Sequence, residues 1–145
     1  MANQNMFFKT ENGVKSVNSA TSLINSGEHT VALNNTGGVV IHDKSNTSAK
    51  IFDDLKTTLK SKINKRSSLV LNDGGFIDIS IIAEAYISPK SGSLLITSIK
   101  DGNLIYLFDS EEYSNLTGLR DVLSNTLMEF DGTTALNAID WASFQ

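Results

Sequence analysis

A pattern of strand, turn, strand and helix occurs twice in the sequence, over residues 30–63 and 96–130. In each copy, two short apolar runs flank a turn rich in Asn, Asp or Gly, which are residues that tolerate the backbone angles of tight hairpins. The first copy continues into Ile51, Leu55 and Leu59, whose spacing predicts a helix, and the second continues into a leucine-rich stretch with similar spacing. Strands and helices of this kind each have to bury one face. The sequence therefore predicts an α+β fold, with an antiparallel sheet of five to seven strands and two main helices packed on it.

The longest predicted strand covers residues 76–88, where Ile77, Ile79 and Ile81 alternate with polar or exposed positions. A turn at residues 89–92 leads into a further strand. The pair Asp101-Gly102, a strong hairpin signal, leads into another. These three strands are expected to form a meander.

The two copies align with an offset of 66 residues in the hairpin, which sets Leu33 on Ile99, and of 67 residues in the helix. Few residues are identical, so a β-β-α pseudo-repeat can reflect either gene duplication or two similar local solutions, and the second explanation is favoured.

For the second helix, Asp109 or Ser110 is the expected N-cap, with Glu112 placed for a capping box.

A chain of 145 residues with 40% hydrophobic and 19% charged residues has the composition of one globular domain, so residues 1–145 are expected to form a single domain. Residues 1–29 are weakly patterned and are interpreted as an N-terminal arm or edge strands. Residues 131–145 form a C-terminal tail with three apolar anchors. Either these anchors close the protein's own core or they bind a neighbouring subunit or partner. The anchors are Ile139, Trp141 and Phe144.

The two copies of the pattern differ in charge. Residues 50–66 contain six of the twelve Lys and Arg residues, whereas residues 101–145 contain eight acidic residues and one Arg. We expect contacts through both surfaces, either within one chain or between chains. The predicted basic patch consists of Lys56, Lys60, Lys62, Lys65 and Arg66, and the predicted acidic patch of Asp109, Glu111, Glu112 and Asp121.

The sequence offers little catalytic chemistry. It has no Cys and only two His residues, His29 and His42, at opposite ends of the first predicted hairpin, and no further His in a metal-binding spacing accompanies them. No GxSxG or P-loop motif is present. Asp78 and Glu84 would lie about 20 Å apart on an extended strand, too far for a glycosidase pair. No catalytic residue, metal or cofactor is therefore expected.

No apolar run is long enough to span a bilayer, and the first residues lack the pattern of a signal peptide. These features predict a soluble protein of the cytoplasm or a virion, without a membrane partner. Ser, Thr and Asn supply 44 of the 145 residues, a composition that resembles bacteriophage proteins. A viral structural protein is the corresponding expectation.

Together, these features predict a non-enzymatic interaction or assembly protein that forms a homo-oligomer or binds another protein. In this hypothesis the basic helix of one subunit contacts the acidic C-terminal region of the next. One alternative is a nucleic-acid-binding protein that uses the basic segment 56–66, although the net charge of −4 does not favour it. Another is an inhibitor of a host protein that acts through the acidic face.

Overall fold

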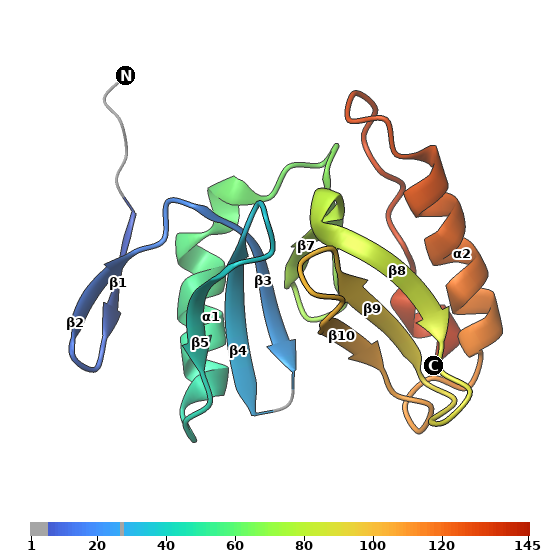
Figure 1. Cartoon of the computed structure of the whole chain (residues 1–145), viewed down its shortest axis with the longest axis horizontal. Helices are drawn as coiled ribbons and strands as arrows, with labels where there is room; N and C mark the ends of the chain where they lie inside the picture. Colours follow the sequence, from blue (N-terminus) through green and yellow to red (C-terminus); the bar gives the residue numbers. More distant parts are fainter. Residues whose placement is uncertain (1–5, 27) are drawn as a thin grey trace.

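The computed structural model describes residues 6–26 and 28–145, and this part of the chain forms ten β-strands and two α-helices (Figure 1). The predicted α+β class, with antiparallel strands and two main helices, is confirmed. The strands divide into sheets of five, three and two strands. The five-stranded sheet contains β3 (Ala20–Ser26), β4 (His29–Asn34), β5 (Val39–Asp43), β6 (Ser68–Val70) and β7 (Phe76–Asp78).

The five-stranded sheet has the order β5-β4-β3-β7-β6, so β3 lies in its middle. The sequence pattern had indicated only an arm or edge strands before residue 30. One reason for this difference is Ser22, a polar residue that is fully buried in β3 and interrupts the apolar pattern. Its hydroxyl accepts a hydrogen bond from the N–H of Asp78 at 2.8 Å, which ties β3 to the end of β7.

The helix α1 (Ser48–Thr58) covers one face of this sheet. Leu55 and Leu59 of the predicted stripe are buried together with Phe52, whereas Ile51 is half-buried. They pack in one core cluster with residues such as Leu23 of β3 and Phe76 of β7. A 3₁₀ turn, Lys60–Lys62, follows the helix.

The single strand expected over residues 76–88 is wrong, because the chain bends and changes sheets within it. A 3₁₀ turn, Ile79–Ile81, separates β7 from β8 (Ile82–Ile87). The Asp78 carboxylate caps this turn by accepting hydrogen bonds from the Ser80 N–H at 3.0 Å and the Ser80 hydroxyl at 2.8 Å. Both Ile79 and Ile81 stay buried through the turn, so its apolar pattern resembles that of a continuous strand.

The three-stranded sheet consists of β8, β9 (Leu94–Ser98) and β10 (Leu104–Phe108) in the order β10-β9-β8. Its buried face packs in a second core with the other face of the five-stranded sheet and with α2 (Leu116–Glu129). Figure 1 shows α2 beside β8 at the end of the molecule opposite α1.

The predicted cap of the second helix is wrong. Asn115 is the N-cap, and its side chain accepts a hydrogen bond from the Gly118 N–H at 3.0 Å. Asp109 instead closes a turn, since its carboxylate accepts a hydrogen bond from the Glu111 N–H at 2.9 Å. This turn places Tyr113 in the core, where its ring packs edge-on against the ring of Phe108.

Both predicted strand-turn-strand-helix units are present, as β4-β5-α1 and β9-β10-α2. The strand β5 begins at residue 39 and β10 at residue 104, an offset of 65 residues rather than the 66 of the sequence alignment. Ile99, which was aligned with Leu33 of β4, lies in the turn after β9. A separate hairpin of β1 (Phe7–Thr10) and β2 (Gly13–Ser16) precedes β3.

Candidate interaction surfaces

Two residues of the predicted basic patch, Lys56 and Lys62, donate hydrogen bonds to main-chain carbonyls through their ammonium groups. The Lys56 ammonium donates a hydrogen bond to the main-chain carbonyl of Asp73 at 3.1 Å and lies 5.1 Å from the centre of the Phe52 ring. The Lys62 ammonium donates to the main-chain carbonyl of Asn18. Both side chains therefore connect α1 and the turn after it to loops of the five-stranded sheet.

The other three residues of the predicted patch, Lys60, Lys65 and Arg66, are exposed. We call them the basic end, because the segment that follows α1 lies at the top of the view in Figure 1. Within residues 6–26 and 28–145, no ion pair involves any of these three residues. The ion pairs of this region are Lys50–Asp54, Lys56–Asp53 and Arg120–Asp121.

Three of the predicted acidic residues, Asp109, Glu111 and Glu112, are exposed in the connection from β10 to α2. We call them the acidic end, because this connection lies at the bottom of the view in Figure 1. Asp121 lies apart from them on α2, and its carboxylate is 3.2 Å from the guanidinium of Arg120. The predicted acidic patch is thus divided, and only its first three members share one end of the molecule.

The two charged segments, 50–66 and 101–145, meet within the chain through the main chain. The Leu136 N–H donates a hydrogen bond to the Lys65 carbonyl at 2.8 Å. Asp131 precedes this contact, and its carboxylate accepts hydrogen bonds from the N–H groups of Thr133 and Thr134. These hydrogen bonds, that of Thr133 first, lower the pKa of the Asp131 carboxyl to about 2. The opposite charges of the basic and acidic ends therefore remain unpaired across the described part of the chain.

The tail docks on the protein's own core. Trp141 is buried, its ring stacks on Phe108 with 5.3 Å between ring centres, and its indole N–H donates to the Val70 carbonyl at 3.1 Å. Ile139 and Phe144 are half-buried against the same core. Of the two explanations for the anchors, closure of the protein's own core is the one that this geometry fits.

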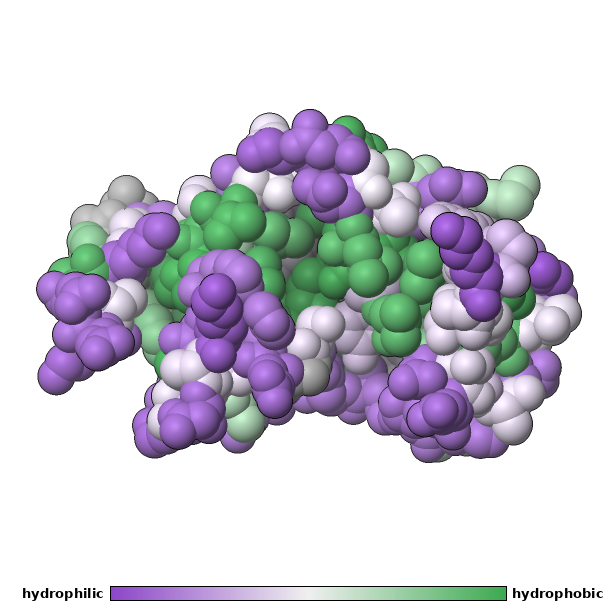
Figure 2. Space-filling view, turned by 60° about the horizontal axis from the view of Figure 1, so that its bottom comes forward, coloured by the Kyte–Doolittle hydropathy of each residue, from purple (hydrophilic) through white to green (hydrophobic). Residues whose placement is uncertain are grey.

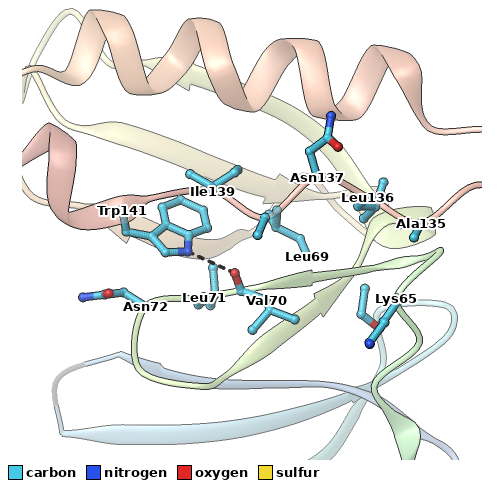
Figure 3. A pocket seen from close by; sticks show the side chains of 12 residues that line it. Lys65, Leu69, Val70, Leu71, Asn72, Ala135, Leu136, Asn137, Ile139 and Trp141 are labelled. Carbon is cyan, nitrogen blue, oxygen red and sulfur yellow. Dashed lines mark hydrogen bonds between the residues drawn. The ribbon is translucent and has the colours of Figure 1, made fainter.

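A groove of about 520 Å³ lies between the tail and the outer edge of β6 (Figure 3). Figure 3 shows the tail passing over β6, with the indole of Trp141 at one end and Lys65 at the other. Its surface suits an apolar group, and the Lys65 ammonium is its only charged side chain. The apolar residues that line it are Leu69, Val70, Leu71, Ala135, Leu136, Ala138, Ile139 and Trp141.

Apolar side chains are also exposed between the two larger sheets. Val39 of β5 and Leu104 of β10 are 60% and 53% exposed and line a second groove of about 240 Å³. Leu107 continues this surface on the outer face of the three-stranded sheet, where it stands opposite Leu95 of β9. In Figure 2, hydrophobic residues gather along the middle of the molecule between hydrophilic ends. Exposed apolar surface of this kind is typical of contact sites.

The acidic residues considered for catalysis have structural or solvent-exposed positions. Asp78 caps the turn between β7 and β8, and Glu84 is exposed on β8. No group of three or more His, Cys, Asp or Glu residues suited to a metal occurs among the residues that the structure describes.

The two histidines, at opposite ends of the hairpin of β4 and β5, lie together. The Nδ1 atom of His29 is 2.9 Å from the Nε2 atom of His42, and the two rings are stacked. The turn residues 34–38 predict a hairpin, and the register of a hairpin decides which residues of its two strands are neighbours. The proximity of the histidines could therefore be predicted from this turn.

Comparisons with protein-family models, curated proteins and solved structures found no match. In the described part of the chain, no helix has the length and apolar character needed to cross a membrane. Function is therefore inferred from the surfaces described above.

Proposed function

We propose that this chain is a non-enzymatic assembly protein that associates with further copies of itself. In the proposed contact, the basic end of one copy faces the acidic end of the next. The observation that carries the proposal is that the basic end and the acidic end, which form no ion pair within the described residues, lie on opposite sides of the molecule, at the top and bottom of Figure 1. Such a contact is head-to-tail and closes into a ring or grows into a filament, unless the opposite patches meet twice in a two-fold dimer.

The exposed apolar surface gives further support to a protein partner. Val39, Leu104 and Leu107 expose large fractions of their side chains although neighbouring positions of the same strands are buried. Charged groups steer partners and set their orientation, whereas apolar surface supplies most of the affinity. The composition, rich in Ser, Thr and Asn, is the support for a viral origin of such an assembly protein.

The nucleic-acid alternative has less support from this geometry. Two of its five basic residues, Lys56 and Lys62, are bound to main-chain carbonyls, so three cations of this segment remain without an ion pair among the described residues, and the net charge of the chain is −4. Phosphate contacts dominate nucleic-acid affinity, so three cations give a weak site. For an inhibitor that acts through its acidic face, the acidic end offers three carboxylates, one of which already holds a turn.

Sedimentation velocity at low and high salt tests the proposal. The Debye length falls from about 30 Å at 0.01 M salt to about 3 Å at 1 M, so a contact between charged ends should weaken strongly. The variant Lys60→Glu/Lys65→Glu/Arg66→Glu should be monomeric at low salt. A matched control, Lys9→Glu/Lys15→Glu/Lys44→Glu, makes the same change in net charge at other exposed lysines and should still associate.

A charge swap makes the test specific. The variant Glu111→Lys/Glu112→Lys should also be monomeric, and mixing it with the basic-end variant should restore association, because each reversed end then meets a complementary one. The proposal fails if the wild-type chain is a monomer at both salt concentrations. It also fails if the basic-end variant associates as the control does.

A further inference from the structure

The paired histidines lie on one face of a well-held hairpin. In the pairing of β4 with β5, His42 stands opposite Val31 and Asp43 opposite Thr30, so His29 is the diagonal neighbour of His42. The turn that joins the strands is fixed by two main-chain hydrogen bonds between Asn34 and residues 37 and 38, at 3.0 and 2.8 Å. The two imidazoles are therefore held near each other by the backbone.

The facing nitrogens are close to the separation that a metal ion requires. Zn²⁺ binds imidazole nitrogen at about 2.0–2.1 Å, and a tetrahedral angle then separates two such nitrogens by about 3.3 Å. His29 Nδ1 and His42 Nε2 are 2.9 Å apart. Because His42 is exposed and His29 is half-exposed, the two rings have room to turn so that their hydrogen bond breaks and both lone pairs converge on one ion.

We propose that His29 and His42 form a two-imidazole chelate for a divalent transition-metal ion that favours nitrogen ligands, namely Cu²⁺, Ni²⁺ or Zn²⁺. Water completes the coordination. This inference does not depend on the proposed assembly, and each can fail without the other.

Metal binding requires a change of tautomer at one ring. In the hydrogen bond between the rings, one of the two facing nitrogens carries a hydrogen. A chelate needs a lone pair on both, so the hydrogens must reside on His29 Nε2 and His42 Nδ1. This change moves one hydrogen from a facing nitrogen to the outer nitrogen of the same ring.

The rest of the chain gives the measurement a low background. The sequence contains no Cys and no other His, so imidazole and thiolate ligands elsewhere are absent. Asp43, the carboxylate next to His42, points to the opposite face of β5 and accepts hydrogen bonds from the N–H and hydroxyl of Ser45. The two imidazoles are thus the ligands that soft or borderline ions should select over Mg²⁺ or Ca²⁺, which prefer oxygen.

The test uses the whole chain without a histidine tag, titrated with ZnSO₄, NiSO₄ or CuSO₄ and with MgSO₄ as the control ion. We expect saturable binding by calorimetry in the order Cu²⁺ above Ni²⁺ and Zn²⁺, and none for Mg²⁺. With Zn²⁺, long-range ¹H–¹⁵N spectra of the imidazoles should place the metal on His29 Nδ1 and His42 Nε2. The melting temperature should rise by a few degrees and return after addition of EDTA.

The variants His29→Gln and His42→Gln each keep one imidazole and separate a chelate from independent binding. Each should bind Zn²⁺ or Ni²⁺ about tenfold or more weakly than the wild type, because the second ligand acts at high effective concentration. Their unliganded circular dichroism should match that of the wild type, which confirms the fold. The proposal is overturned if either variant keeps the wild-type affinity, or if millimolar Zn²⁺, Ni²⁺ and Cu²⁺ leave the imidazole signals unchanged, as expected for a hydrogen-bonded pair only.

Discussion

Replacing Trp141 by alanine should lower the free energy of unfolding by about 3–5 kcal/mol. The side chain is 6% exposed, and burial of 150–250 Å² of aromatic surface at about 25 cal/mol per Å² is worth about 4–6 kcal/mol before the pocket relaxes. The substitution also removes the hydrogen bond to Val70, worth about 1 kcal/mol. Because Val70 is exposed, water can replace the indole at its carbonyl, so no further penalty is expected.

Urea unfolding followed by far-ultraviolet circular dichroism measures this effect without depending on the removed fluorophore. The variant Trp141→Phe keeps a ring against Phe108 and loses the indole N–H, so we expect a loss of about 1–2 kcal/mol. The control Met128→Ala changes a side chain that is 85% exposed and should stay within about 0.5 kcal/mol of the wild type. A loss below about 1 kcal/mol for Trp141→Ala would refute the conclusion that the tail completes the core.

Two further predictions concern a close backbone contact and a half-buried tyrosine. In Gly75→Ala the added Cβ would lie 2.7 Å from the Leu23 carbonyl oxygen, which is a main-chain atom of the central strand. We therefore expect the free energy of unfolding, measured in urea, to fall by about 1–3 kcal/mol. An unchanged urea midpoint would contradict this expectation. Burial, and then the charge of Asp73, raise the pKa of Tyr106 far above its usual range. Above about pH 10 the Tyr106 hydroxyl loses its proton in the unfolded state but keeps it in the folded state, so the free energy of unfolding falls as the pH rises. The variant Tyr106→Phe lacks this group and should unfold at a higher pH than the wild type in alkaline titrations followed by circular dichroism. An unchanged alkaline midpoint in that variant would count against this cause.

The parts of the fold that depend on nearby residues could be predicted from the sequence. The hairpin of β4 and β5 follows from the turn residues between Asn34 and Gly38, and α1 follows from the spacing of Ile51, Leu55 and Leu59. In these segments, the pattern that predicts an element comes from residues of that element itself. Local pattern and final structure therefore agree.

The parts that depend on distant residues could not be predicted. The central place of β3 rests on its pairing with β7, where Leu23 stands opposite Phe76, far along the chain. The bend at residues 79–81 keeps both isoleucines buried and so leaves the apolar pattern of a strand. The local sequence does not distinguish a residue that is buried within its own sheet from one that is buried against a neighbouring sheet.

The charged surfaces show the same limit. The number of basic residues was visible in the sequence, but Lys56 and Lys62 make hydrogen bonds to Asp73 and Asn18, which no spacing rule connects to them. The acidic residues could be counted in the same way, yet Asp121 lies beside Arg120 and apart from the acidic end. The number of charged residues therefore predicted the sign of each surface but not which residues form it.

The position of β3 between β4 and β7 has a consequence for any attempt to divide the protein. A fragment that stops before residue 64 would contain α1 and three strands of the sheet but would lack β6 and β7. One side of β3 would then offer its main-chain N–H and C=O groups to any passing strand, and such open edges promote aggregation. A shortened version intended to isolate the histidine hairpin should therefore extend at least through Asp78, where the returning strand closes that side.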